Sequence, residues 1–151
     1  MNEEKDVPKG AGKKLVYILV GTVLAFQLIT VDKTNPNYDK KDEIKAPKEV
    51  MSILKRSCWD CHSNDTVWPW YASIAPFSWT ISRHVVVGRQ YVNFSIWETY
   101  TQEQKDKKLE DIYKAMHTAM PLEGYVSMHK DAKVSQKDRD LIRVWTGKAP
   151  F

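Results

Sequence analysis

Two cysteines and a histidine lie close together in the chain, in the segment Cys58-Trp59-Asp60-Cys61-His62. Two thiols three residues apart, followed at once by a histidine, form the pattern by which c-type haem is attached to proteins. On a helix-like turn, such thiols reach two vinyl-derived carbons at one edge of the porphyrin, and the adjacent imidazole binds the iron from the proximal side. The sequence therefore predicts one haem c, covalently attached through Cys58 and Cys61, with His62 as an iron ligand.

Other uses of two nearby cysteines fit the sequence less well. A thioredoxin-like redox pair has the same spacing, but no segment alternates apolar and polar residues as the strands of that fold require. A zinc site needs a fourth ligand. Two cysteines in 151 residues exclude a disulfide-dense scaffold, and a scattered net charge of +4 gives no reason to expect nucleic-acid binding.

The iron needs a second axial ligand or a deliberately open position. The candidates are His84, His117, His129, Met51, Met116, Met120 and Met128. Met120 precedes Pro121, which keeps the residue before it extended and so presents the thioether to a cleft. Met51 lies on the proximal side, and Met116 falls on an apolar helical stripe. Met120 is therefore the predicted distal ligand, and His129, His84 or an open site remain alternatives.

Aromatic and basic side chains near the motif are candidates for contact with the porphyrin. Flat rings bury a large area against a flat cofactor, and the candidates are Trp68, Trp70, Tyr71 and Trp79. The alternative is that these residues form part of the hydrophobic core. Arg89 is a candidate partner of a haem propionate because guanidinium binds carboxylates in a fork. Arg83 and the Lys105–Lys108 run are interpreted as solvated helix faces.

The elements that must position these residues are expected to be helices. After Pro47, the residues Val50, Leu54 and Cys58 recur at steps of four and predict a short helix that leads into the motif. Pro76 is expected to open a second helix that runs to about Tyr91. A stripe of apolar residues predicts a helix over 102–118; its members are Leu109, Ile112, Tyr113 and Met116.

Two capping signals complete this helical prediction. Ser95 with Glu98 three residues later has the form of a capping box, and Ser135 with Asp138 has the same form at the start of the last helix. That helix is expected to present Leu141, Ile142 and Trp145 on one face and to stop at Gly147. The predicted fold class is all-α.

An uncharged apolar stretch near the N-terminus, residues 15–31, predicts a single transmembrane helix. A buried core helix and a cleaved signal peptide are the alternatives, but no small-x-small pair follows the stretch. The Lys13-Lys14 pair before it favours an N-terminus inside and the domain outside. The predicted organisation is a cytoplasmic segment 1–14, an anchor 15–31 in the lipid bilayer, a polar tether 32–46 and a haem-binding domain 47–151.

Several further motifs resemble the bacterial haem-binding domain family over about residues 31–146. They are Thr34-Asn35-Pro36, Ser57 to Asn64, Trp68-Pro69-Trp70-Tyr71, Ala75-Pro76-Phe77-Ser78-Trp79, Gly88-Arg89, Asn93-Phe94-Ser95 with Trp97, Met120-Pro121 with Tyr125 and His129, and Trp145. The resemblance implies a membrane-attached monohaem cytochrome c that faces the periplasm. The order of haem motif, Met-Pro and capped last helix is also similar to class I cytochromes c, and that likeness implies Met120 as the distal ligand.

The expected function is therefore single-electron transport at the bacterial inner membrane, with the haem domain on the periplasmic side. The expected partners are a membrane redox complex or other cytochromes. A haem-based sensor or small-ligand binder with a labile sixth site is the alternative. Weak peroxidase activity ranks last, because no distal acid–base pair stands out in the sequence. A structural subunit, whose anchor and surface matter more than its haem, is a further alternative.

Overall fold

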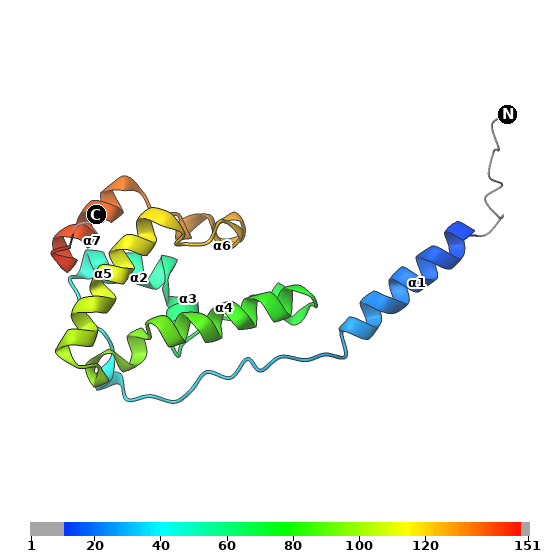
Figure 1. Ribbon diagram of the computed structural model, residues 1–151, viewed down its shortest axis with the longest axis horizontal. Coiled ribbons are helices and arrows are strands. Elements are labelled where there is room, and N and C mark those ends of the chain that lie inside the picture. Colours follow the sequence, from blue (N-terminus) through cyan, green and yellow to red (C-terminus); the bar gives the residue numbers. More distant parts are fainter. Residues whose placement is uncertain (1–10, 149–151) are drawn as a thin grey trace. The chain divides into compact units, whose positions relative to one another are not determined.

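In the computed structural model, which describes residues 11–148, every regular element is a helix (Figure 1). The α-helices are α1 (Ala11–Phe26), α2 (Lys48–Ser57), α3 (Trp59–His62), α4 (Phe77–Tyr91), α5 (Gln102–Thr118), α6 (Glu123–Met128) and α7 (Gln136–Thr146). The 3₁₀-helices are η1 (Lys40–Asp42), η2 (Trp70–Ser73), η3 (Phe94–Thr99) and η4 (Lys130–Ala132). The predicted all-helical class is confirmed for these residues, and the cytochrome c-like topology stays a prediction.

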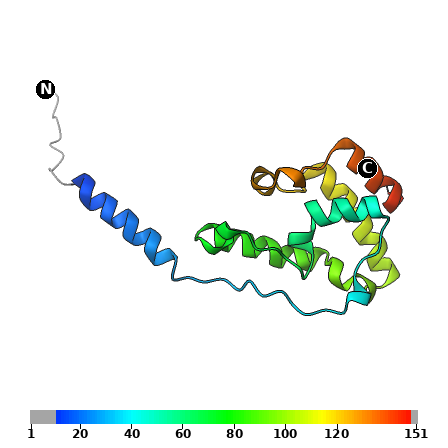
Figure 2. The ribbon, with the colours of Figure 1, turned by 180° about the vertical axis from the view of Figure 1, so that it is seen from behind.

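The chain forms two compact units. The first consists of the chain up to Asp32 together with Pro69–Ser82, and the second consists of Lys33–Trp68 together with the chain from Arg83 onward. In the second unit, α7 packs against both α2 and α5, as the two opposite views in Figures 1 and 2 also show.

The core of the second unit arises from the apolar faces of these helices. Three of the four residues in the predicted α5 stripe, Ile112, Tyr113 and Met116, are buried, and Leu109 packs against them. In α7, Ile142 is fully buried, whereas Leu141 and Trp145 are only partly buried. The predicted helix faces are thus confirmed.

The helix ends follow the sequence signals except at one place. Ser135 and Asp138 form the predicted capping box of α7, and Gly147 ends that helix in the left-handed conformation with φ of 65°. The capping box predicted for Ser95 and Glu98 is wrong: η3 begins there, and the side chain of Asn93 accepts the hydrogen bond from the Ser95 amide. Ser95 is buried, and its hydroxyl oxygen instead accepts a hydrogen bond from the Asn64 backbone amide.

In the first unit, the residues after α1 bind the aromatic segment 69–82. The Gln27 side-chain amide donates to the Ala75 carbonyl at 3.2 Å, and its oxygen accepts from the Ala75 amide at 3.0 Å. Trp79 meets Phe26 edge to face at 5.3 Å between ring centroids and donates its indole N–H to the Ile29 carbonyl.

The transmembrane helix predicted over residues 15–31 is wrong. Helix α1 ends at Phe26 and has 16 residues, a length of about 24 Å against a bilayer core of about 30 Å. Its first turn holds Lys13 and Lys14, and the side chain of Gln27, directly after the helix, binds Ala75. No helix within residues 11–148 is both long and apolar enough to cross a membrane. The predicted single-pass location in the inner membrane is overturned with it.

The predicted segment boundaries at residues 14, 31 and 46 stay predictions. Residues 1–10 of the predicted cytoplasmic segment lie outside the described residues, as do residues 149–151 of the predicted haem-binding domain.

Candidate functional site

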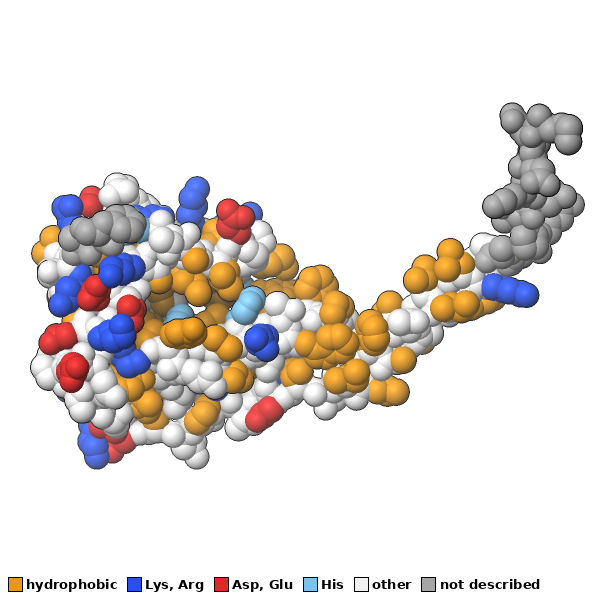
Figure 3. All heavy atoms as spheres, in the orientation of Figure 1, with side chains coloured by type: hydrophobic (Ala, Val, Ile, Leu, Met, Phe, Trp, Pro, Cys, Tyr) orange, Lys and Arg blue, Asp and Glu red, His pale blue; other side chains and the backbone are white. Residues whose placement is uncertain are grey.

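The second unit contains an apolar cavity of about 300 Å³. Its lining includes Cys58, Cys61 and His62 from the motif and also Met120, although 58 residues separate the histidine from the methionine. In Figure 3, hydrophobic side chains gather around a hollow on this unit. The cavity thus brings together two thiols, an imidazole and a thioether.

The His62 ring is held by the end of α4. Its Nδ1 lies 2.9 Å from the Gly88 carbonyl oxygen and 3.1 Å from that of Val92. Because both partners are acceptors, Nδ1 must carry the proton, and Nε2 keeps its lone pair. Burial lowers the pKa of His62, against the opposing effect of these two hydrogen bonds, and so favours the neutral ring. A neutral imidazole with a fixed tautomer is the form that binds a metal.

The close approach of α4 to the motif depends on Gly88. A Cβ atom at this position would lie 2.5 Å from the carbonyl oxygen of Cys61 and 3.1 Å from its carbonyl carbon. Both are backbone atoms that cannot rotate away. The absence of a side chain at Gly88 therefore lets its carbonyl reach the His62 ring.

Both thiols are free and partly buried. Burial raises the pKa of Cys58 to about 12 and that of Cys61 to about 11. Redox-active thiols have lowered pKa values, so the environment is unlike that of a thioredoxin-type pair. Over residues 11–148, no three His, Cys, Asp or Glu side chains come together as metal ligands, which argues against the zinc alternative.

Met120 and two other candidates for the distal ligand, His84 and Met116, line the cavity. Met116 is only 3% exposed and belongs to the hydrophobic core. Met120 follows the end of α5, and its amide donates to the Ala115 carbonyl at 2.8 Å. His129 lies outside the lining, where its ring stacks on Tyr125 at 4.2 Å between centroids.

The residues present fit a haem group. The cavity is apolar, one imidazole nitrogen is available, and soft sulfur ligands face the same space. The buried Ser57 hydroxyl also lines the cavity and has no hydrogen-bond partner in the structure. A buried hydroxyl without a partner is costly, and a bound group with acceptor atoms would supply one.

Comparison with known families agrees with this chemistry, since residues 21–148 match the family described as "Haem-binding domain". The chain belongs to the haem-binding domain family. It is therefore a haem protein, as the motif resemblance predicted. No curated protein and no solved structure matches the chain.

Several residues predicted to contact the haem lie outside the lining of this haem-binding domain's cavity. Trp70, Tyr71 and Trp79 belong to the first unit, and Trp70 is 73% exposed. Trp68 is half-buried in the second unit but is not among the lining residues.

Arg89, the predicted propionate partner, donates hydrogen bonds to backbone and side-chain oxygens of the protein. It donates to the Ser63 carbonyl at 2.7 Å, Asn35 Oδ1 at 2.7 Å and Thr66 Oγ1 at 2.9 Å. It also lies 3.3 Å from the Thr34 carbonyl oxygen. Arg89 therefore ties the chain directly after His62 to residues 34 and 35.

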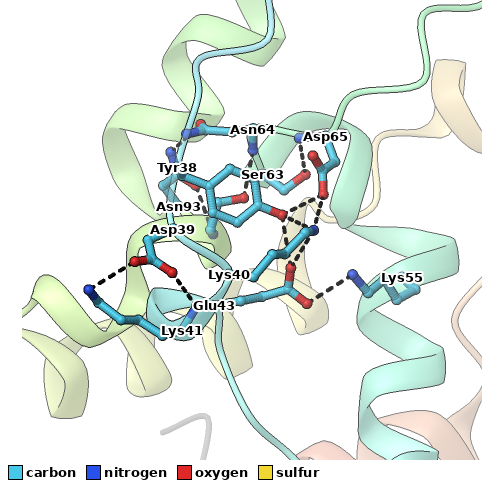
Figure 4. A network of polar contacts seen from close by, with 11 residues as sticks. Tyr38, Asp39, Lys40, Lys41, Glu43, Lys55, Ser63, Asn64, Asp65 and Asn93 are labelled. Atoms are coloured by element: carbon cyan, nitrogen blue, oxygen red, sulfur yellow. Dashed lines mark hydrogen bonds and ion pairs between the residues drawn. The ribbon is translucent and has the colours of Figure 1, made fainter.

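We call residues 33–43 the strap. They lie in the segment 32–46 that was expected to be a polar tether, and polar contacts join Tyr38, Lys40 and Glu43 to Asp65 and Lys55 of the same unit (Figure 4). Tyr38 Oη lies 2.5 Å from Asp65 Oδ2, and Lys40 Nζ lies 2.8 Å from the same oxygen. Glu43 accepts from Lys40 at 3.1 Å and from Lys55 of α2 at 3.2 Å. The strap thus contacts the segment that directly follows the haem motif.

Lys108 lines the cavity, which the sequence interpretation did not expect. It was assigned to a solvated helix face, but it is half-buried and lines the cavity. A signal was available: Lys108 lies four residues before the buried Ile112 and so shares its helix face. The spacing of residues in the sequence does not show that this face of α5 borders the cavity. Only the three-dimensional position of the cavity shows it.

Proposed function

We propose that this haem protein is a monohaem c-type cytochrome that carries single electrons. In this proposal Cys58 and Cys61 form thioether bonds to the haem, and His62 and Met120 are the axial ligands. The observation that supports it best is that the lining of one apolar cavity contains both thiols, the imidazole and the thioether. Other cytochromes or the subunits of a redox complex would be its partners.

The protein groups have distinct tasks in this function. When bound, haem supplies the reversible one-electron couple, while the chain supplies ligands, burial and a docking surface. A His/Met ligand pair favours the reduced state relative to two histidines. The hydrogen bonds from His62 Nδ1 to Gly88 and Val92 keep the ring in one orientation and support Nε2 as the donor atom.

Covalent attachment is tested on the denatured chain. The wild-type protein, made in a host with a c-type maturation system, is expected to keep its haem after unfolding and acid–acetone extraction. A mass spectrum should show the chain plus one haem. The Cys58→Ala/Cys61→Ala double variant should release all of its haem under the same treatment. Haem release from the wild-type protein would refute the c-type assignment.

The distal ligand is tested by Met120→Ala. If Met120 binds the iron, this variant should lose the spectral signature of thioether ligation in the ferric state, and its reduction potential should fall. Met128→Ala is the matched control, because Met128 is 55% exposed and lies outside the cavity lining. An unchanged spectrum and potential in Met120→Ala would refute the assignment. Fast, complete binding of carbon monoxide by the reduced wild-type protein would favour the sensor alternative over the carrier.

A further inference from the structure

The charged groups that line the cavity are few. They are Asp60, Asp111 and Lys108. The lining also contains two imidazoles, those of His62 and His84. Asp60 accepts hydrogen bonds from the Tyr125 hydroxyl at 2.7 Å and from the Val67 amide at 3.0 Å. Asp111 lies 3.9 Å from Lys107 Nζ. Among residues 11–148, Lys108 is therefore the one lysine or arginine that lines the cavity.

Lys108 is fixed in position but has no carboxylate in contact. Its Nζ donates a hydrogen bond to the Tyr91 carbonyl and lies 4.5 Å from the centroid of the Tyr100 ring. None of the ion pairs among residues 11–148 includes it. Burial lowers the pKa of Lys108, and the charge of Asp111 only partly opposes this effect. The ammonium group is thus partly desolvated, and a negative partner would compensate it.

A haem group brings such a partner, because it carries two propionate carboxylates. An anion that enters an apolar cavity needs a hydrogen-bonded counter-charge. Arg89 is committed to the strap and to Ser63, and Arg83 does not line the cavity.

We propose that Lys108 Nζ binds a haem propionate. This inference rests on the haem site proposed above, and it assigns a carboxylate-binding residue to the wall of the cavity. The contact with the Tyr91 carbonyl and the Tyr100 ring holds the ammonium group on the lining before the cofactor arrives. Less side-chain freedom is then lost when the carboxylate binds.

This assignment predicts a direction for the reduction potential. A carboxylate without a counter-charge near the iron favours the ferric state, which carries one more positive charge than the ferrous state. A lysine that neutralises the carboxylate removes this preference. Loss of the Lys108 charge should therefore lower the reduction potential.

The first test needs no variant. The full wild-type chain, prepared without haem, is titrated with ferric haem and with its dimethyl ester, in which both carboxylates are blocked. We expect the ester to bind about tenfold more weakly or worse, as for the loss of a charge-assisted hydrogen bond. Equal affinities would overturn the proposal. If neither compound binds, the proposed site itself fails, which is a different result.

The second test assigns the effect to Lys108. In Lys108→Met the preference for haem over its ester should be lost, and the reduction potential of the haem-loaded protein should fall. Lys108→Arg should keep both properties, and so should Lys107→Met, which removes an exposed lysine one position away on the same helix. If Lys108→Met keeps the wild-type preference and potential, the lysine is only a structural contact of Tyr91.

Discussion

The hydroxyl of Tyr125 donates a hydrogen bond of 2.7 Å to Oδ2 of Asp60. Asp60 lies between the two cysteines of the haem motif, and Tyr125 lies in α6, five residues after Met120. The second carboxylate oxygen, Oδ1, accepts from the Val67 amide at 3.0 Å. A single carboxylate thus connects the motif that contains His62, the proposed proximal ligand, to the segment that carries the proposed distal ligand.

Tyr125→Phe removes this connection. Because the hydrogen bond goes to a charged acceptor that is only half-buried, its loss should cost about 1–2 kcal/mol of unfolding free energy. The segment with Met120 should also be held less tightly, so added imidazole should bind the ferric haem faster. Denaturant titration and stopped-flow absorbance measure the two effects. Tyr17→Phe, at a tyrosine of α1 that is 73% exposed and outside the cavity lining, should change neither. Wild-type stability in Tyr125→Phe would contradict the role of the bond.

Gly88→Ala tests the close packing of α4 on the motif. The new methyl group would lie 2.5 Å from the Cys61 carbonyl oxygen, so the backbone of one segment must move. We expect a loss of about 1–3 kcal/mol in stability and weaker binding of ferric haem by the chain prepared without haem, because His62 loses the alignment of its acceptor. Gly124→Ala is the matched control: nothing lies within 4 Å of its Cβ position, and alanine favours the helix. Equal behaviour of the two variants would show that the motif tolerates the shift.

The local parts of this molecule were predictable from sequence, and the long-range parts were not. Thiol and imidazole spacing in the motif and the apolar stripe of α5 are patterns within about one to four helical turns, where chain geometry alone determines which side chains meet. The sequence interpretation gave Arg89 a haem propionate and placed Lys108 on a solvated helix face, whereas Arg89 binds oxygens of its own unit and Lys108 lines the cavity. Their partners come from segments 17 to 55 positions away, such as the Tyr91 carbonyl and Thr34, and helical periodicity does not identify such partners.

The apolar N-terminal stretch illustrates a different limit. Hydropathy predicted one spanning helix over residues 15–31, but the helix ends at Phe26, and the side chain of the next residue, Gln27, pairs with both backbone groups of Ala75. A single polar residue in an apolar run carries little weight in a hydropathy average. Its two hydrogen bonds to a distant segment nevertheless join the end of the helix to residue 75, which a hydropathy average does not show.

Arg89→Lys tests whether Arg89 fixes the strap. Lysine keeps the positive charge but lacks the planar fork that reaches several oxygens at once. The unfolding free energy should fall by about 1–3 kcal/mol, and limited proteolysis should cut within residues 33–43 sooner than in the wild-type protein. Arg83→Lys is the control at an exposed arginine on the same helix. If Arg89 served a haem carboxylate instead, the main effect of Arg89→Lys would appear in haem affinity, and the strap would stay protected.

Asp138 connects the start of α7 to the end of α2. Its Oδ2 lies 2.6 Å from Arg56 and also accepts from the Ser135 amide at 2.8 Å. Burial tends to raise the pKa of Asp138, but the hydrogen bonds from Ser135 and the charge of Arg56 outweigh it, so the pKa is lowered from its usual value of 3.8. Both side chains are mostly withdrawn from solvent, and this pair is therefore less screened than the surface pairs of the same unit.

A lowered carboxylate pKa in the folded state means that Asp138 contributes stability above its unfolded-state pKa. This contribution is lost as the pH falls through the lower, folded-state value. The free energy of unfolding of the wild-type protein should therefore exceed that of Asp138→Asn by about 1–2 kcal/mol at neutral pH. This difference should shrink once the pH falls below about 4. Denaturant titrations of both proteins across this range measure it. Asp140→Asn, whose carboxylate is 3.9 Å from Arg143 and half exposed, should cost little at any pH. A pH-independent difference for Asp138→Asn would mean that the hydrogen bonds matter and the charge does not.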